Sequence, residues 1–287
     1  MKSNTIKFKE NKQQLMHGGK AYDNGEFIHS RDGRTIRILS EYLYPEQYFN
    51  KHEIKNAIVF YGSARTMPLD VWESKMSNLK RKLEQTVNES DKGPIVAEIE
   101  QLEKIKFLSE VYQEAVETAR MMAEWAETLP KNKRIYVCTG GGPGMMEAAN
   151  RGAYLAQSPS IGLNISLPFE QTPNNYISGE LNFEFHYFFM RKFWFSYLAA
   201  AMVALPGGFG TMDELFEILT LRQTKKVTRP MPIVLYSSKF WKSFINFDYL
   251  VDIKMINKSD LDLFQFCDTP QEAFDHLTTE LTKIHKL

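Results

Sequence analysis

The stretch from Pro206 to Glu214 most constrains how this chain can fold, because it marks a strand, a glycine turn and a helix. It reads Pro-Gly-Gly-Phe-Gly-Thr-Met-Asp-Glu, with an apolar run at 202–205 before it and an amphipathic run at 215–221 after it. Glycines let a backbone pass close to a ligand, and the amides at a helix start favour an anion. The stretch therefore predicts a phosphate-binding turn with the Glu214 carboxylate close by.

Two further turns repeat this arrangement. The apolar run at 135–138 is followed by Thr-Gly-Gly-Gly-Pro-Gly at 139–144 and then by a helical pattern. The apolar run at 57–61 leads into Gly62 and Ser63. Each turn alone is compatible with a plain tight connection between a strand and a helix. Because open α/β sheets bind ligands at the carboxyl edge of their strands, we expect the three turns to lie together at one site.

Apolar runs alternate with helical patterns along the chain, which predicts βαβ units with right-handed crossovers. The expected fold class is α/β: a Rossmann-like open, mostly parallel sheet with helices on both faces, an N-terminal extension and an inserted helical hairpin. The strands are expected at 57–61, 135–138, 161–165, 202–205, 232–236 and 264–267. Neither G-x-G-x-x-G nor G-x-x-x-x-G-K-[ST] occurs in the turns, which disfavours NAD binding and Mg-ATP hydrolysis by the usual loops.

The expected organisation is an N-terminal extension at 1–54 that packs on a single domain at 55–287. The extension carries a helical pattern at 34–54, which Pro45 interrupts. A later helix is expected at 190–201, directly before the strand at 202–205.

A helical hairpin at about 70–110 interrupts the domain. Asp70 is expected to cap a first helix that runs to about Ser90, and Asp91-Lys92-Gly93-Pro94 is expected to break it. A second helical pattern runs from Val96 to Ala119. The hairpin is either an oligomerisation arm or lid, or a solvated helical excursion with no further role.

Composition excludes several classes of protein. The 287 residues are 43% hydrophobic, and 35 Lys and Arg balance 35 Asp and Glu, which argues against nucleic acid as the main partner. No apolar run is long enough to cross a membrane, and the polar stretch at 1–20 lacks a secretory core, so we expect a cytoplasmic protein. Cys138 and Cys267 lie in apolar runs and are expected as buried thiols. No His or Cys spacing indicates a metal site.

The chain resembles the LOG family, whose members are nucleoside 5′-monophosphate phosphoribohydrolases and many of which once carried a lysine decarboxylase label. The Gly-Gly-Gly-Pro-Gly-Met-Met run at 140–146 and the P-G-G-x-G-T-x-x-E motif at 206–214 carry the resemblance, together with the pair Arg191-Lys192. The resemblance covers about residues 56–250 and points to a longer bacterial subgroup. Small cytokinin-activating members have a His where this chain has Phe189, so the sequence leaves the preferred base open.

The resemblance implies hydrolysis of the N-glycosidic bond of a purine nucleoside 5′-monophosphate, AMP-like or cytokinin-riboside-monophosphate-like, without a cofactor. Glu214 matches the catalytic glutamate, and a carboxylate there would stabilise an oxocarbenium-like ribose or activate water. Arg191 matches the catalytic arginine, which would hold Glu214 in place or contact the substrate. Lys192 receives no catalytic role. The residues expected to bind or shape the phosphate site are Gly62, Ser63, Gly141, Gly142, Gly144, Gly207, Gly208, Phe209, Gly210 and Thr211.

Several side chains keep two interpretations. Asp213 either touches the ribose or caps its helix, and Glu147 either reaches the pocket or is an exposed carboxylate at a helix start. Phe188, Phe189 and Trp194 either stack on a purine or belong to the core.

The motifs favour hydrolysis over two other function classes. A non-catalytic nucleotide-binding protein on the same scaffold is the alternative to the hydrolase, and the Arg191 and Glu214 pair favours the enzyme. A pyridoxal-phosphate decarboxylase is disfavoured because no Schiff-base lysine motif is visible. The helix at 190–201 has aromatic residues around most of its circumference, so we expect a homodimer or a higher homo-oligomer.

Overall fold

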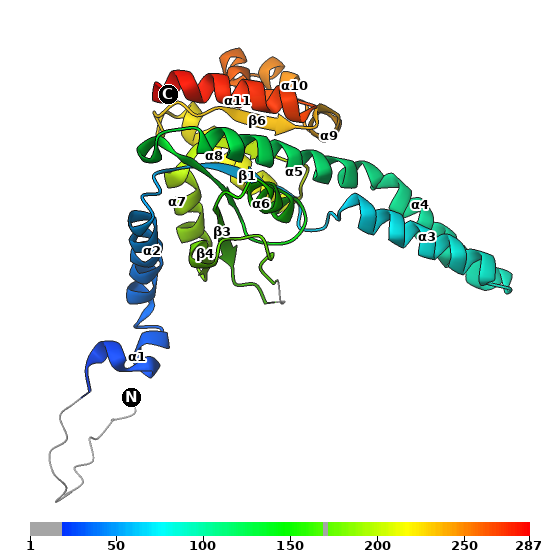
Figure 1. Cartoon of the computed structure of the whole chain (residues 1–287), viewed down its shortest axis with the longest axis horizontal. Coiled ribbons are helices and arrows are strands. Elements are labelled where there is room, and N and C mark those ends of the chain that lie inside the picture. The colour runs from blue at the N-terminus through cyan, green and yellow to red at the C-terminus, as the bar shows by residue number, and fades with distance from the viewer. Residues whose placement is uncertain (1–18, 169–171) are drawn as a thin grey trace, which may run out of the picture.

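The strands of the sheet all run in parallel, so their carboxyl ends meet along one edge. The computed structural model describes residues 19–168 and 172–287, and the expectations for residues 1–18 lie outside it (Figure 1). The sheet has seven strands in the order β4-β3-β2-β1-β5-β6-β7. Their bounds are β1 Asn56–Tyr61, β2 Ile135–Thr139, β3 Ser160–Ile165, β4 Asn182–Phe185, β5 Ala199–Ala204, β6 Ile233–Tyr236 and β7 Gln265–Cys267. The predicted Rossmann-like α/β fold is confirmed.

Helices cover both faces of this sheet. The α-helices are α1 Gly25–His29, α2 Arg34–Lys51, α3 Leu69–Gln85, α4 Glu89–Lys104, α5 Lys106–Glu127, α6 Met145–Leu155, α7 Phe188–Leu198, α8 Phe209–Gln223, α9 Ser238–Phe244, α10 Phe247–Asp252 and α11 Pro270–His285. Short 3-10 helices lie at η1 Ala21–Asp23, η2 Lys131–Lys133, η3 Gly179–Leu181 and η4 Lys258–Leu263. One core cluster packs α2, α7, α8 and α9 on the sheet, and the other packs α5, α6 and α11 on the opposite face.

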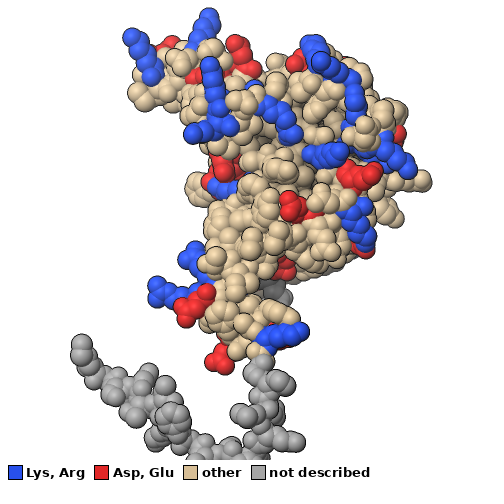
Figure 2. All heavy atoms as spheres, turned by 90° about the vertical axis from the view of Figure 1, so that its left-hand side faces the viewer, with Lys and Arg blue, Asp and Glu red and all other residues tan. Residues whose placement is uncertain are grey.

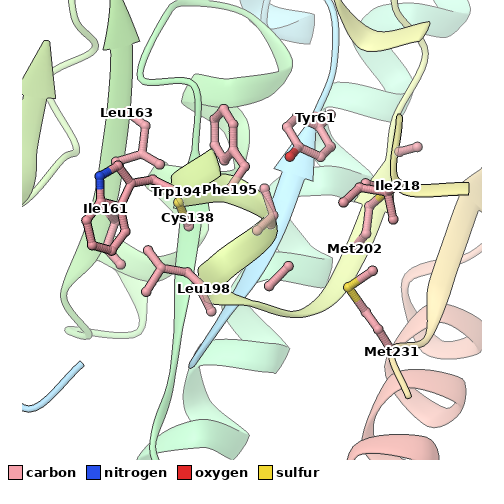
Figure 3. Close-up of a cluster of buried hydrophobic side chains, with 14 of the residues drawn as sticks. Tyr61, Cys138, Ile161, Leu163, Trp194, Phe195, Leu198, Met202, Ile218 and Met231 are labelled. Atoms are coloured by element: carbon pink, nitrogen blue, oxygen red, sulfur yellow. The ribbon is translucent and has the colours of Figure 1, made fainter. Parts of the chain in front are cut away.

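Alternation along the strands divides the core between these two faces. In β1, Val59 and Tyr61 point into one cluster, whereas Ile58 and Phe60 point into the other. Figure 3 shows part of the first cluster, where Trp194 of α7 lies beside Ile161 of β3 and the ring of Phe195 packs on that of Tyr61 at the end of β1. Cys138 lies in this cluster and Cys267 in the other, and both are buried free thiols. The sheet is therefore buried on both sides, as a parallel sheet requires.

The order of the strands creates a crevice beside β1. The chain adds β2, β3 and β4 on one side of β1 and then returns to place β5 on the other side. At such a switch point the connections leave the sheet in opposite directions, which opens a ligand crevice at the carboxyl edge. The turns after β1, β2 and β5 are the three glycine turns of the sequence, so they are neighbours at this crevice.

The boundary between α7 and β5 differs from the predicted one. The expected helix at 190–201 ends at Leu198, and Ala199, Ala200 and Ala201 open the strand instead. Alanine favours helix in isolation, but β5 pairs with β1 at the centre of the sheet, where these small residues are almost fully buried. Tertiary packing therefore overrides local propensity here.

Strand β4 was not predicted, because 183–189 showed only as an aromatic run. It is a parallel edge strand that pairs with β3 and alternates between exposed and buried residues. Phe183 and Phe185 point into the core, and this alternation over four residues was the signal in the sequence.

The inserted hairpin consists of α3 and α4, which extend away from the sheet (Figure 1). The predicted break at 91–94 is wrong: the turn lies at 86–88, and Gly93-Pro94 falls inside the first turns of α4. The predicted Asp70 cap is also wrong, because Pro68 precedes the helix and Asp70 lies in its first turn. This hairpin of α3 and α4, called the arm below, has a small core of its own, which contains Trp72, Met76, Leu79, Ile95 and Leu102.

The second helical pattern of the sequence divides at Ile105 into α4 and α5. The buried indole N–H of Trp72 donates to the Leu102 carbonyl at 2.8 Å. A continuous helix would use that carbonyl for the amide four residues later. At this break the Leu102 carbonyl accepts instead from the Trp72 indole and from the Ile105 amide, at 3.3 Å, so it keeps partners where the helix ends.

Helix α2 runs through Pro45 rather than stopping there. Proline leaves the carbonyl four residues earlier without its helical partner, and here that carbonyl belongs to Glu41. The indole N–H of Trp194 donates to the Glu41 carbonyl at 3.0 Å. The Glu41 carboxylate accepts from the amides of His186 and Tyr187 at 2.8 and 3.2 Å, directly before α7 begins. Helix α2 therefore fixes the start of α7, the helix that carries Arg191.

None of the helices in the described part of the chain is both long enough and apolar enough to cross a membrane.

Candidate functional site

The backbone of Ser63 joins the three glycine turns into one wall. Its amide donates to the Pro206 carbonyl at 3.0 Å, and its carbonyl accepts from the Met145 amide at 2.9 Å. Gly144 has a φ of +72° and packs so tightly on this junction that a Cβ there would collide with the Ser63 carbonyl. The turns after β1, β2 and β5 are thus held at a fixed mutual distance.

A cavity of about 860 Å³ opens above this wall, at the carboxyl edge of β1 and β5. Nine of the residues expected to act in catalysis or at the phosphate site line it: Gly62, Ser63, Arg191, Gly207, Gly208, Phe209, Gly210, Thr211 and Glu214. Apolar side chains form much of the remaining wall, namely Tyr61, Met146, Ile165, Leu167, Phe188, Met212, Phe240 and Phe244. A volume of this size is typical of a small-molecule site.

Helix α8 begins inside the cavity. Gly208 precedes its first residue, Phe209, and no side chain caps this end. A Cβ at Gly207 would collide with the side chain of Thr211, so glycine lets the turn pack closely on the buried threonine. The first amides of an uncapped helix need acceptors from outside the helix, and the dipole favours an anionic one. This end of α8 is suited to a phosphate or a carboxylate group.

Arg191 and Glu214 form an ion pair on the cavity wall. Arg191 Nη2 lies 2.8 Å from Glu214 Oε1, and each side chain is only 11% exposed. The rings of Phe188 and Phe195 lie 5.5 Å from the guanidinium carbon and restrict its movement. Among the described residues, none accepts a hydrogen bond from Arg191 Nε, although this atom is buried. The pair therefore joins α7 to α8 in a largely dehydrated position that still borders the cavity.

Burial sets the protonation of Glu214. Loss of solvent raises the pKa of this carboxyl to about 7, because the Arg191 guanidinium lowers the pKa by less than burial raises it. Asp213 and Glu217 raise the pKa further, and Lys192 lowers it. A carboxyl group with a pKa near neutrality can both accept and return a proton at physiological pH.

The second glycine turn lies differently from the prediction. Gly141, Gly142 and Gly144, expected to bind or shape the phosphate site, are absent from the lining, to which this turn contributes Gly140. The Asn174 side chain donates to the carbonyls of Gly141 and Gly142 at 3.1 and 3.0 Å. These two glycines are turned toward the 172–178 segment because it supplies the donors for their carbonyls.

Asp213 and Glu147, the two carboxylates with alternative interpretations, also lie outside the cavity lining. Asp213 pairs with Lys192 at 2.7 Å and its side chain is 55% exposed, so it does not cap its helix. Glu147 accepts from the Tyr112 hydroxyl at 2.8 Å, toward α5. Lys192 also pairs with Glu217 at 3.2 Å, in the next turn of α8.

The three candidate aromatic residues separate in the structure. Phe188 lines the cavity, whereas Phe189 lines a different concavity between α2 and α7, and Trp194 is buried in the core. Phe240, Ser243 and Phe244 of α9 were not singled out from the sequence. Their position after β6 could have predicted their place in the lining, since β6 ends at the same edge of the sheet as β5.

Within residues 19–168 and 172–287, no group of three or more His, Cys, Asp or Glu side chains is placed to hold a metal ion. The charged residues of the cavity lining are Arg65, Arg191 and Glu214.

We expect the Glu214 carboxyl to titrate near pH 7, because burial disfavours its charged form. Carbon NMR of protein labelled at the glutamate carboxyl carbons would measure this, with the Glu214→Gln variant to assign the signal. In Arg191→Met the midpoint should rise further, since the cation that lowers the pKa is removed. A midpoint near the ordinary value for glutamate, about 4.3, would contradict the expectation.

Comparison with known proteins identifies a family for this site. Residues 146–277 match the protein-family model described as "Possible lysine decarboxylase". A search of curated proteins gives no significant match. The X-ray structure of TM1055, a structural-genomics target, is 18% identical, covers 78% of this chain and 99% of its own, and gives a TM-score of 0.46. The Moco carrier protein from Chlamydomonas reinhardtii is 16% identical, covers 79% of this chain and 99% of its own, and gives a TM-score of 0.42.

The matched region contains α7, β5 and α8, and with them Arg191, Glu214 and the glycine turn at 206–210. This agrees with the family to which the motifs of the sequence pointed. The chain therefore carries a domain of the lysine decarboxylase-like family, known as the LOG family.

Proposed function

We propose that the protein is a nucleoside 5′-monophosphate phosphoribohydrolase. It cleaves the N-glycosidic bond of a purine nucleoside 5′-monophosphate, AMP-like or cytokinin-riboside-monophosphate-like, to give the free base and ribose 5-phosphate. The observation that carries the proposal is the buried pair of Arg191 and Glu214 on the wall of a cavity that also holds the uncapped start of α8. Membership of the LOG family, many of whose members are phosphoribohydrolases, supports it.

The cavity offers a separate region for each part of such a substrate. The phosphate binds the first amides of α8, around Phe209, Gly210 and Thr211, where the dipole favours an anion. The base lies against the apolar wall, to which Phe188 and Phe244 contribute aromatic rings of the kind that stack on a purine. The ribose then lies between the two regions, near Glu214.

Glu214 acts on the anomeric carbon of the ribose. Its carboxylate takes a proton from water while the water oxygen bonds to C1′, and the bond from C1′ to the base nitrogen breaks with its electron pair leaving on the base. The base nitrogen then takes up the proton that Glu214 accepted from water, which regenerates the carboxylate. A carboxylate near C1′ also stabilises the oxocarbenium-like transition state, as in other glycoside hydrolyses. A pKa near 7 leaves enough carboxylate for this step at neutral pH.

Arg191 positions the carboxylate. The ion pair and the flanking rings of Phe188 and Phe195 hold the guanidinium in one geometry, so Glu214 has little freedom to turn away from the substrate.

The name of the matching family model refers to a different reaction, lysine decarboxylation. Decarboxylation with pyridoxal phosphate needs a lysine that forms a Schiff base with the cofactor. The described residues that line the cavity include no lysine. We therefore assign the cavity to a nucleotide rather than to this cofactor.

Incubation of the protein with AMP should release adenine and ribose 5-phosphate, which chromatography would detect. Adenosine should react at least roughly 100-fold more slowly in kcat/KM, because two charge-assisted hydrogen bonds to the phosphate contribute about 3 kcal/mol or more. A panel of purine and pyrimidine monophosphates would define the base. If no monophosphate yields base although AMP binds, the alternative of a non-catalytic nucleotide-binding protein replaces the hydrolase.

Glu214→Gln and Arg191→Ala should each lower kcat by about 100-fold or more, since one removes the charge that faces C1′ and the other removes its support. In the wild type, kcat/KM should fall as the pH drops below about 7, because protonation removes the active carboxylate. Circular dichroism would check that both variants stay folded.

Lys192→Ala and Glu217→Gln are the matched controls. They break a neighbouring ion pair between the same two helices, and both residues lie outside the cavity lining. Their activity should stay within a few-fold of the wild type. Equal losses in the control and test variants would mean that the contact between α7 and α8, rather than the chemistry of Glu214, limits the reaction.

We also propose that a second copy of the chain covers the outer face of α2 and α7. Leu39, Leu43, Phe189, Phe193 and Tyr197 are all exposed on these helices, with exposed fractions of 39% to 59%. An apolar concavity of about 430 Å³ lies between the helices. Figure 2 faces this side of the molecule, and a broad area without charged side chains crosses it. An exposed apolar area of this kind indicates a protein interface.

Light scattering should therefore give at least twice the chain mass of 33.3 kDa at micromolar concentration. Phe193→Glu should shift the protein toward monomer, because it places a charge in the apolar face. Val87→Glu, at the exposed turn of the arm, is the control and should leave the mass unchanged. A wild-type mass equal to one chain would refute the proposal.

A further inference from the structure

Arg65 is a cation of the cavity lining that the sequence motifs did not single out. It follows Ser63 and Ala64 in the segment between β1 and α3, and it lines the same cavity as Arg191 and Glu214. We propose that Arg65 binds the 5′-phosphate of the substrate and gives the site its preference for phosphorylated ribosides. The proposal rests on the function proposed above and names the residue that recognises the phosphate charge.

The charge balance of the cavity supports this role. Arg191 lies 2.8 Å from the Glu214 carboxyl, whereas Arg65 is the cation of the described lining that has no carboxylate beside it. The start of α8 adds about half a positive charge from its dipole. A phosphate monoester carries about −1.5 to −2 charges at pH 7. The amides alone leave most of that charge without a counterpart, and a guanidinium is suited to bind phosphate oxygens in pairs.

Arg65 is available for a ligand. Within residues 19–168 and 172–287, no carboxylate oxygen lies within 4.0 Å of its guanidinium, and its side chain is exposed. By contrast, Arg120, Arg134 and Arg191 each pair with a glutamate. A phosphate would therefore bind Arg65 without first breaking an ion pair between Arg65 and any of the described carboxylates.

The backbone beneath Arg65 is fixed, although the side chain is exposed. The Arg65 amide donates to Ser63 Oγ at 3.0 Å, and the buried Thr66 hydroxyl donates to the Ser63 carbonyl at 3.3 Å. Ser63 is the residue that joins the three turns through Pro206 and Met145. The same junction thus sets the position of Arg65 relative to the start of α8, which lowers the entropy that a phosphate contact must overcome.

Calorimetry with ribose 5-phosphate tests the proposal without relying on turnover. Titrations would compare the wild type, Arg65→Ala and Arg65→Lys, and would add adenosine as the ligand without a phosphate. Arg65→Ala should weaken ribose 5-phosphate binding by roughly 10- to 100-fold, the effect of one charge-assisted contact. Arg65→Lys should recover part of that loss, and adenosine binding should change less than about 2-fold in either variant. The wild-type affinity for ribose 5-phosphate should also fall more steeply with salt than that of Arg65→Ala.

Arg81→Ala is the matched control, because Arg81 is an exposed arginine on the neighbouring α3 that contacts Asn78 rather than the cavity. It should bind both ligands as the wild type does. Unchanged ribose 5-phosphate affinity in Arg65→Ala would overturn the proposal, as would equal weakening of both ligands or no wild-type binding of ribose 5-phosphate. If the wild type binds ribose 5-phosphate but releases no base from any monophosphate, the proposed hydrolase activity is refuted. The binding data of the Arg65 variants would then still decide whether Arg65 binds the phosphate.

Discussion

The candidate site depends on two backbone hydrogen bonds of one residue, Ser63. Its amide and carbonyl join the turn after β1 to the turns after β5 and β2. Parallel strands alone bring these turns to one edge, but they do not fix the turns against one another. The hydrogen bonds of Ser63 fix the turns against one another. Gly144 permits this packing because it has no Cβ to collide with the Ser63 carbonyl. The start of α8, the lining glycines and Arg65 all take their positions from this junction.

A second set of contacts places the functional arginine. Pro45 leaves the Glu41 carbonyl without its helical partner, and Trp194 of α7 uses that carbonyl. The Glu41 carboxylate satisfies two amides at the start of the same helix. The N-terminal helix α2 is therefore part of the support of Arg191, even though it lies far from Glu214 in the sequence. An apparent helix breaker thus contributes to the contact between two helices.

Burial gives the ion pair its chemical character. Arg191 and Glu214 are mostly dehydrated, so the carboxylate loses more from burial than it gains from the guanidinium, and its pKa rises to about 7. Next to these two residues in the sequence, Lys192 and Asp213 form a similar pair, but Asp213 is half-exposed. The two pairs use the same types of charge, and only their depth separates a proton-transfer group from a surface contact.

The sequence by itself determined the fold class, and it pointed to the glycine turns, Arg191 and Glu214 of the cavity lining. Glycine turns after apolar strands need little information beyond the local chain, because the absence of a Cβ and the free amides at a helix start are local properties. Tertiary structure decided the rest. Ala199–Ala201 form a strand because they pair with β1. Gly141 and Gly142 lie outside the cavity lining because their carbonyls accept hydrogen bonds from the Asn174 side chain. Arg65 lies in the lining because its backbone amide is held by a hydrogen bond to Ser63 Oγ. Each of these outcomes depends on a partner distant in the sequence, which no local pattern records.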